Sequence, residues 1–431
     1  MNRLSIFILI LLFSSNVFAQ DWPQFLGPER NCISQQKNLL RVWPEGGPEV
    51  LWTVPVGIGY AGPVVKDGKV YMLDRDEKVG DKLRCFDLAS GGELWKYEYD
   101  APGSVPFPGS RSIPVVDGDY VYSCGAMGDL YCIDINTHKP VWNKNVWQDF
   151  GGGKIPTWAI TQNPVVYGDL LITAAQTKST GIVAYNKNTG EVKWTTPQMG
   201  PTGYASPEIV TINGEKQIVM VTAGTGDNGK VYAVDPDTGE VLWQYSNFQC
   251  RIPSTGVMDI GDNKVFVTGG YNAGSAMLKI EQMEDGSYNV NELYTTPDFG
   301  VHTLPPVLYQ GYFYGQYSTN ERRDGLVCMS VDGEIKWATK RNPQFNKGSI
   351  IIADGLMLAT DGFNTLYLID PDPGELKVIS SAEMLNQGGV DTSNRMTNFG
   401  GSTQNWAPMA LADGKLLIRD QSHMYCLKVV E

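Results

Sequence analysis

The sequence predicts an all-β fold: an eight-bladed propeller whose blades are four-stranded antiparallel sheets. Two observations lead to this prediction. A short hairpin that ends on a large aromatic residue recurs along the chain, and a Pro-led apolar hairpin precedes each copy. Each repeat therefore holds four short strands, and successive copies lie about 42 to 52 residues apart. A four-stranded repeat of this period is typical of a propeller blade.

The clearest copy of the repeat is GKVYAVDPDTGEVLW at residues 229–243. Residues 231–234 are small and apolar, as in a buried strand, and the DPDTG stretch that follows favours a tight turn. Pro presets φ, the side chain of Asp235 caps its own backbone, and Gly239 supplies a positive φ. The next strand then begins and ends on Trp243. The segment is therefore predicted to be a β-hairpin.

Counting the fourth strands gives eight blades. They end at or near Trp52, Trp95, Trp142, Trp194, Trp243, Tyr294, Trp337 and Val378. The first fourth strand, residues 49–54, has no three strands before it. The last three strands, within residues 408–429, have no fourth strand after them. We therefore expect the N-terminal strand to complete the last blade, which closes the ring and removes unpaired sheet edges.

The N-terminus is expected to be a targeting segment. Residues 1–19 combine a short basic start, an apolar run and a small-residue cleavage site, the pattern of a signal peptide. The apolar run is too short to cross a membrane as a mature helix. We expect an exported protein, periplasmic or secreted, without an integral membrane segment.

After the signal segment, residues 20–48 are expected to be a lead-in that packs on the propeller through Trp22, Phe25 and Trp43, and residues 49–431 to be the propeller itself. The formal net charge of −13 argues against nucleic acid or an anionic membrane surface as the partner. We expect a monomer.

Seven cysteines in an exported chain raise the question of disulfides. The repeat register instead assigns four of them to a small apolar core position, where free cysteine packs as a hydrophobe: Cys85, Cys132, Cys328 and Cys426. A disulfide between Cys124 and Cys132 is the alternative. No cysteine spacing indicates haem or metal attachment.

A candidate site follows from the repeat. The first strand of each propeller blade lines the central channel, so the residues just ahead of these strands are expected to converge at the axis: Tyr60, Arg111, Trp158, Gln162, Tyr204, Arg251, His302, Lys347, Asn405 and Trp406. Cations and aromatic faces together suit an anionic or polyhydroxylated ligand. In the alternative interpretation, the cations pair with carboxylates such as Asp298 or Glu208 and merely tie blades together.

The A-x-D-x-x-T-G-x-x-x-W pattern of residues 233–243 resembles the repeat of the pyrroloquinoline quinone (PQQ)-like propeller superfamily. That superfamily includes quinoprotein alcohol dehydrogenases and the lipoprotein propeller of the outer-membrane barrel-assembly machinery. The resemblance covers roughly residues 49–431. It implies that the repeat tryptophans dock between neighbouring blades as structural residues: Trp95, Trp142, Trp194, Trp243 and Trp337.

Two departures from these relatives bear on function. The chain has no pair of adjacent cysteines, whereas the resemblance implies that a quinoprotein dehydrogenase stacks PQQ on such a disulfide. It also lacks a lipid-attachment cysteine directly after residue 19. Fold resemblance by itself does not establish function.

We therefore predict an exported, non-catalytic binding or scaffold propeller. It would recognise a periplasmic or extracellular protein, or an anionic or glycan ligand, through its central funnel and faces. The alternative that the resemblance implies is a PQQ- and Ca²⁺-dependent quinoprotein dehydrogenase that oxidises an alcohol or sugar. In that alternative Asp298 beside Ca²⁺, or His302, is the candidate base. Whether the protein is an enzyme stays open at this point.

Overall fold

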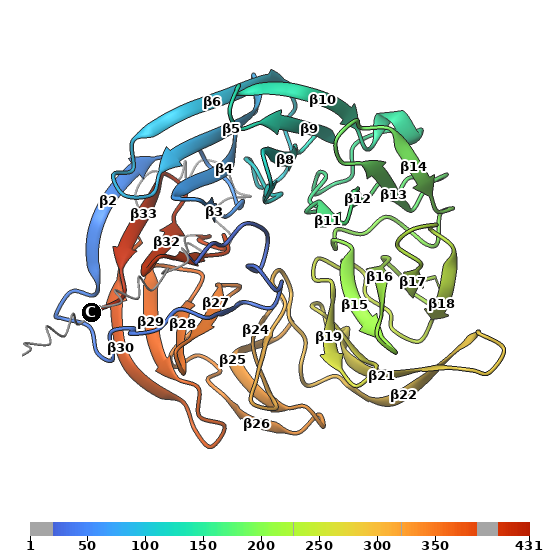
Figure 1. Cartoon of the computed structure of the whole chain (residues 1–431). Coiled ribbons are helices and arrows are strands. Elements are labelled where there is room, and N and C mark those ends of the chain that lie inside the picture. The colour runs from blue at the N-terminus through green and yellow to red at the C-terminus, as the bar shows by residue number, and fades with distance from the viewer. Residues whose placement is uncertain (1–19, 227, 320, 386–403) are drawn as a thin grey trace, which may run out of the picture.

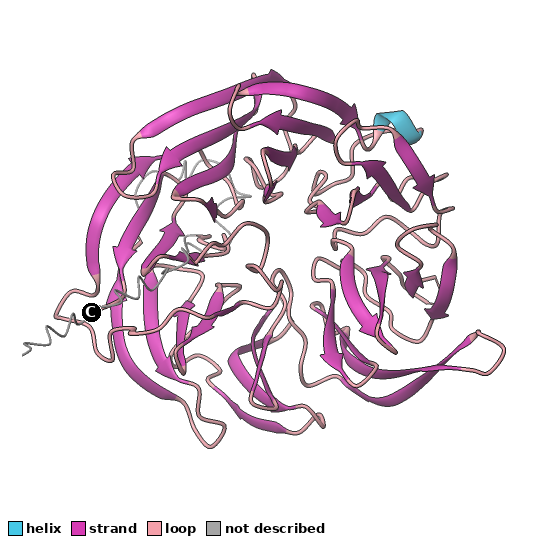
Figure 2. Cartoon of the chain, viewed as in Figure 1, coloured by secondary structure: helices cyan, strands magenta, loops and turns pink. Residues whose placement is uncertain are grey.

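The computed structural model describes residues 20–226, 228–319, 321–385 and 404–431. The predicted signal segment, residues 1–19, lies outside the described residues. Figure 1 shows sheets arranged as a ring around a central axis, and Figure 2 shows that the described ring is almost entirely strand and loop. Its one described helix is the 3₁₀ turn η1 (Gln148–Phe150). The predicted eight-bladed, four-stranded antiparallel propeller is confirmed.

The strands follow one another blade by blade. The first blade consists of β3 (Val64–Lys66), β4 (Lys69–Asp76), β5 (Gly80–Asp87) and β6 (Glu93–Asp100), and the second of β7 (Val115–Asp117), β8 (Tyr120–Cys124), β9 (Asp129–Asp134) and β10 (Lys139–Asn145). The third blade consists of β11 (Val165–Tyr167), β12 (Leu170–Ala174), β13 (Ile182–Asn186) and β14 (Val192–Thr195). The fourth consists of β15 (Glu208–Ile212), β16 (Glu215–Val221), β17 (Val231–Val234) and β18 (Val241–Tyr245).

The fifth blade consists of β19 (Val257–Gly261), β20 (Lys264–Gly269), β21 (Gly274–Gln282) and β22 (Tyr288–Thr296). The sixth consists of β23 (Val307–Tyr309), β24 (Tyr312–Ser318), β25 (Arg323–Ser330) and β26 (Ile335–Ala338). The seventh consists of β27 (Ile350–Ala353), β28 (Leu356–Thr360), β29 (Thr365–Asp370) and β30 (Lys377–Glu383). The eighth blade joins β31 (Ala410–Ala412), β32 (Lys415–Arg419) and β33 (His423–Lys428) to β2 (Glu49–Pro55) near the N-terminus.

The ring closes as predicted. β2 pairs antiparallel with β33, with Trp52 opposite Cys426. The indole Nε1 of Trp52 donates a hydrogen bond of 3.0 Å to the carbonyl of Leu88 in the first blade. Closure therefore joins the last blade to the first by the same kind of contact that joins other neighbouring blades.

The repeat turn explains how neighbouring blades are joined. In the turn after β17, Asp235 Oδ1 accepts the backbone N–H groups of Asp237 and Thr238, and Gly239 has a φ of 74°. A Cβ on Gly239 would lie 2.4 Å from the ring of Trp194 in the preceding blade. The indole of Trp194 also donates to the carbonyl of Pro236 at 3.0 Å. Glycine is required here by both the backbone conformation and the close approach of the ring.

Most repeat aromatics make this contact with the turn of the next blade. The indoles of Trp142 and Trp337 donate to Lys187 and Asp372 carbonyls, and the Tyr294 hydroxyl donates to Val331. Trp95 instead stacks on the ring of His138, which replaces the turn glycine, at 4.9 Å between centroids. Trp243 donates to Gln217 within its own blade. The tryptophans thus have the structural role that the family resemblance implied. Trp243 differs only in that its hydrogen-bond partner lies in its own blade.

The cysteines pack as core residues. All seven are free and buried, so the alternative of a disulfide between Cys124 and Cys132 is wrong. Burial raises the pKa of the thiols of Cys85, Cys132 and Cys426 to about 12, which keeps them unreactive at neutral pH.

The lead-in segment is more integrated than its composition suggested. Trp22 exchanges two backbone hydrogen bonds with Val65, and β1 (Ile33–Ser34) adds a parallel fifth strand to β27. Between these points Arg30 forms an ion pair of 2.8 Å with Glu208 at the start of β15. Figure 1 shows this blue segment running from the centre of the ring across the blade of β27–β30 to β2. The lead-in therefore crosses the channel and links blades far apart in sequence.

Candidate functional site

A cavity of about 690 Å³ lies on the axis of the propeller. Each of the eight blades contributes at least one lining residue, which places the cavity at the centre of the ring. Phe25 of the lead-in segment also lines it. The size is in the usual range of small-molecule sites.

The loops that lead into the first strands supply most of the lining, as the sequence predicted. Seven of the eight predicted ligand-binding residues line the cavity: Tyr60, Arg111, Trp158, Arg251, His302, Lys347 and Trp406. Tyr204, from the same class of loops, lines it as well. The eighth, Gln162, does not. Its side chain is buried and its Nε2 donates to the carbonyl of Gly203 at 3.1 Å, so it fastens two blades together.

Sequence reasoning missed a second class of lining residues. Tyr271, Arg323 and Phe363 also line the cavity, and they lie at or beside the connections between the second and third strands of their blades. Because strands alternate in direction within an antiparallel blade, these connections open on the same face as the loops before the first strands. That alternation was the signal that could have found them.

Aromatic rings form one continuous part of the wall. The rings of Tyr60 and Trp406 stack with centroids 5.6 Å apart. Phe107 lies 5.5 Å from Trp158 and 6.0 Å from Trp406. The Tyr60 hydroxyl donates to Gln404 Oε1 at 2.9 Å, which fixes the orientation of its ring. Arg111 and Lys347 lie over the rings of Tyr60 and Trp406, at 5.9 Å and 4.2 Å from the ring centres, so the wall places aromatic surface directly beside the cations.

Four basic side chains line the same cavity: Arg111, Arg251, Arg323 and Lys347. Arg111 donates to the carbonyls of Pro106, Phe107 and Gly109, and burial lowers its pKa to about 10. The guanidinium of Arg251 lies 5.1 Å from the centre of the Tyr271 ring. The Lys347 ammonium lies 4.2 Å from the centre of the Trp406 ring, and burial lowers the pKa of Lys347 to about 8.

Carboxylates are absent from the described lining of this cavity. The two that could have neutralised the cations bind other arginines. Glu208 pairs with Arg30 of the lead-in, and Asp298 is exposed and pairs with Arg322 at 3.4 Å. Among the described residues, none of the four lining cations forms an ion pair with a carboxylate.

His302 lines the cavity beside these cations. Its ring lies edge-on to Tyr271, with centroids 4.7 Å apart, and its Nδ1 is buried without a hydrogen-bond partner. Burial first, and then the charge of Lys347, lower the pKa of His302 well below its usual value. The imidazole is therefore neutral at physiological pH.

Comparison with known proteins assigns the chain to a family. A family model described as outer membrane protein assembly factor BamB matches residues 79–339, which is more than half of the chain. This chain belongs to the BamB family. BamB of Yersinia pestis is 22% identical over 414 residues, which cover 89% of each chain. The resemblance to PQQ-like propellers that the sequence indicated is confirmed.

Quinoprotein dehydrogenases are also similar to this chain. The quinoprotein ethanol dehydrogenase of Pseudomonas aeruginosa is 26% identical over 163 residues, which make up 35% of this chain and 24% of that enzyme. The chain thus matches about a quarter of the length of that relative. Among solved structures, BamB from Moraxella catarrhalis superposes with a TM-score of 0.59 at 14% identity, covering 88% of this chain and 97% of that one. A europium-containing methanol dehydrogenase superposes with a TM-score of 0.65 at 13% identity, covering 93% and 89%. At these identities the solved structures establish the fold alone.

The residues of this BamB-family cavity fit PQQ and Ca²⁺ unequally. The carboxylates of PQQ would meet the four lining cations and its flat rings the aromatic wall. Ca²⁺ needs several oxygen ligands, carboxylates above all, and the described lining offers amide and hydroxyl oxygens but no carboxylate beside its four positive charges. The described residues also contain no cluster of three or more His, Cys, Asp or Glu side chains suited to a metal. Asp298, the candidate base beside Ca²⁺, lies outside the cavity lining. The donor set does not fit Ca²⁺, and we derive no step through it.

Nowhere in the described ranges does a helix have the length and apolar character needed to cross a bilayer.

Proposed function

We propose that this chain is a non-catalytic binding propeller of the cell envelope whose central cavity takes an anionic group of its ligand or partner. One observation carries the proposal. Four basic side chains line a cavity whose described residues include no carboxylate, in a chain of net charge −13. A concave site whose lining charges all have one sign attracts ligands of the opposite charge, and the hydrogen bonds between them are strengthened by the charges.

The energetics of the cations support binding more than blade fastening. A charged group that loses water without gaining a counter-ion is costly, and this cost lowers the pKa of Lys347 and Arg111. A ligand carboxylate would offset it. Elsewhere in the fold, buried Arg30 and Arg75 pair with the carboxylates of Glu208 and Asp81, whereas buried Arg419 donates to the backbone carbonyls of Gly57 and Ala61.

The chemistry of the wall narrows the ligand class. The aromatic side chains of Tyr60, Trp158 and Trp406 line the cavity beside the cations, which favours a ligand that carries a sugar or planar ring next to its negative charge. An acidic glycan or an acidic, aromatic segment of a partner protein meets this description. The full-length relative described as an outer membrane protein assembly factor supports a protein partner for this chain.

The second candidate is a PQQ-dependent dehydrogenase. Two observations favour it: the match to quinoprotein ethanol dehydrogenase and the fit of PQQ carboxylates to the lining cations. Against this candidate, the described cavity lining contains no carboxylate that could bind Ca²⁺ or act as the catalytic base.

Thermal melts and calorimetric titration of the purified protein test the proposal. The probes are trigalacturonate as an acidic glycan, maltotriose as its neutral counterpart, and PQQ with and without Ca²⁺. A ligand that binds only the folded state raises the melting temperature by mass action. We expect trigalacturonate or PQQ to raise it and maltotriose to leave it unchanged. Binding of maltotriose as tightly as trigalacturonate, or of no anionic probe at millimolar concentration, would contradict the proposal. Tighter PQQ binding with Ca²⁺, together with alcohol oxidation, would favour the dehydrogenase.

A further inference from the structure

We propose that Lys347 is a nucleophilic amine that captures a carbonyl-bearing carboxylate in the central cavity as a reversible imine. This inference rests on the proposed anion-binding function and adds a covalent step to it. The ligand class it names is an organic acid with a ketone or aldehyde close to its carboxylate.

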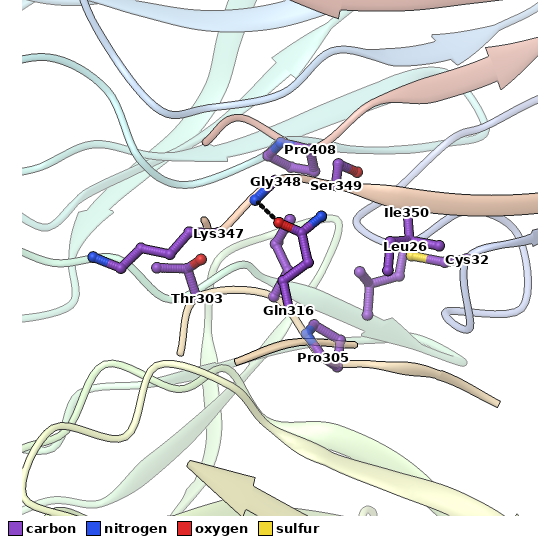
Figure 3. Close-up of a pocket in the computed structure, with 11 residues that line it drawn as sticks. Leu26, Cys32, Thr303, Pro305, Gln316, Lys347, Gly348, Ser349, Ile350 and Pro408 are labelled. Atoms are coloured by element: carbon purple, nitrogen blue, oxygen red, sulfur yellow. Dashed lines mark hydrogen bonds between the residues drawn. The ribbon is translucent and has the colours of Figure 1, made fainter. Parts of the chain in front are cut away.

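The position of Lys347 is the first support. The residue lies in the loop before β27 and lines the central cavity. It also borders a void of about 10 Å³ beside Leu26 and Cys32 of the lead-in. Figure 3 shows its side chain running away from Leu26, Cys32 and Ile350, so the amine is turned away from the lead-in segment. Its Nζ lies over the face of Trp406 at 4.2 Å.

The surroundings of the amine are the second support. Other lysines of the described chain, such as Lys66 and Lys336, pair with a carboxylate at 2.7 Å and 2.8 Å. Lys347 has no such partner among the described residues, and the charged groups that share its cavity are Arg111, Arg251 and Arg323. A carboxylate partner would hold the amine protonated and block attack. Burial instead favours the neutral form of the amine, and the cations that line the cavity attract the carboxylate of an incoming acid.

The population of neutral amine agrees with this geometry. With a pKa of about 8, roughly a quarter of the Lys347 side chains are neutral at pH 7.5, compared with about 0.1% for an ordinary exposed lysine. Lysines activated in this way by burial form Schiff bases with carbonyl compounds.

The step balances without an oxidant or reductant. The Lys347 nitrogen attacks the carbonyl carbon, a C–N bond forms, and the carbonyl electron pair moves to oxygen, which takes up a proton. The carbinolamine then loses water as the C=N bond forms. We assign the neutral His302, which lines the same cavity, as the acceptor of the proton that leaves the nitrogen. The net reaction joins amine and carbonyl and releases one water, and hydrolysis reverses it.

Reductive trapping with a matched pair of acids tests the inference. Phenylpyruvate and phenyllactate share a carboxylate and a phenyl ring, and only phenylpyruvate has a ketone. With cyanoborohydride at pH 7.5, we expect phenylpyruvate to leave one adduct, of its own mass less one oxygen. Peptide mapping should place it at Lys347 at least tenfold above any other lysine. Excess phenyllactate should protect Lys347.

Two variants separate the outcomes. Lys347→Arg keeps the positive charge without a nucleophilic amine, so it should lose the adduct. Lys336→Arg, at an exposed lysine outside the cavity, should label like the parent. If Lys347→Arg melts at a lower temperature than the parent, Lys347→Met repeats the test. Adducts spread over many lysines, or an adduct that persists without Lys347, would overturn the imine. Binding of phenyllactate without labelling by phenylpyruvate refutes the imine alone, whereas failure of both acids to bind also counts against the proposed function.

Discussion

The lead-in segment and the central cavity use basic side chains in opposite ways. Where the lead-in meets the blades, three cations have a carboxylate within salt-bridge distance: Arg30 with Glu208, Arg41 with Asp354 and Lys66 with Asp21. In the cavity, the cations have no carboxylate partner among the described residues. In the first region the charges hold the chain in place. In the second, Arg111 donates to backbone carbonyls, and we propose that the lining cations serve a ligand.

The largest expected effect comes from breaking the pairing of Arg30. The side chains of Arg30 and Glu208 are 10% and 8% exposed, so Arg30→Met leaves a carboxylate buried without a counter-ion. Loss of one partner of a buried pair costs about 3 kcal/mol of unfolding free energy. A thermal melt should show a clearly lower midpoint.

The exposed pair provides the control for Arg30. The Arg41 side chain is 57% exposed, so Arg41→Met should cost less than about 1 kcal/mol. Adding Glu208→Gln to Arg30→Met should recover stability. A melt of Arg30→Met that matches the parent would show that the lead-in pair does not hold the chain in place.

A smaller effect is expected from removing an unpaired cation. The folded pKa of Lys347 is about 8, below the value near 10.4 of an unfolded lysine. Between pH 8 and pH 10.4 the unfolded chain binds more protons at Lys347 than the folded chain does, so the free energy of unfolding rises with pH over this range. Below about pH 8 the buried charge of Lys347 destabilises the folded protein by its full amount. At pH 7, Lys347→Met should therefore have a free energy of unfolding about 1 kcal/mol larger than that of the parent, and it should melt at a higher temperature.

The advantage of Lys347→Met should shrink as the pH approaches 10, since both proteins then lack the charge in the folded state. Paired melts from pH 7 to 10 measure the difference, and other titrating groups cancel between them. A variant that is less stable than the parent at pH 7 would mean that Lys347 is paired like Arg30.

The aromatic wall is expected to contribute least. Trp158→Ala removes one ring face from the cavity, and aromatic contacts are worth about 0.5 to 1.5 kcal/mol. Binding of PQQ by calorimetry should weaken about two- to tenfold, and binding of citrate, which has no ring, should change less. Equal losses for both probes would indicate that Trp158 shapes the loop rather than contacting the ligand.

The repeat made most of this fold predictable. The turn chemistry around Gly239 and the spacing of the repeat tryptophans determine the blade count, and the unmatched strand at residues 49–54 determines the closure. The same register located the loops before the first strands, so Arg251 and Lys347 could be assigned to the axis from the sequence.

The structure differs from the sequence predictions at a few residues, each for its own physical reason. Gln162 sits between Thr161 and Asn163, which both line the cavity, so extended backbone turns its side chain the other way. Arg323 belongs to a different class of loop. The lead-in has no repeat to align, and its ion pair between Arg30 and Glu208 joins residues 178 positions apart, which no local pattern reveals.

The central claim is that the unpaired cations of the cavity bind an anion. A calorimetric titration of the Arg251→Ala/Arg323→Ala double variant with trigalacturonate and with PQQ tests it most directly. The control is Lys193→Ala/Lys336→Ala, which removes the same charge at exposed lysines paired with Glu191 and Glu334. Hydrogen bonds to charged groups are worth about 1.5 to 3 kcal/mol each. The account predicts binding at least tenfold weaker in the cavity variant and unchanged in the control. Equal affinity in the two variants would contradict it.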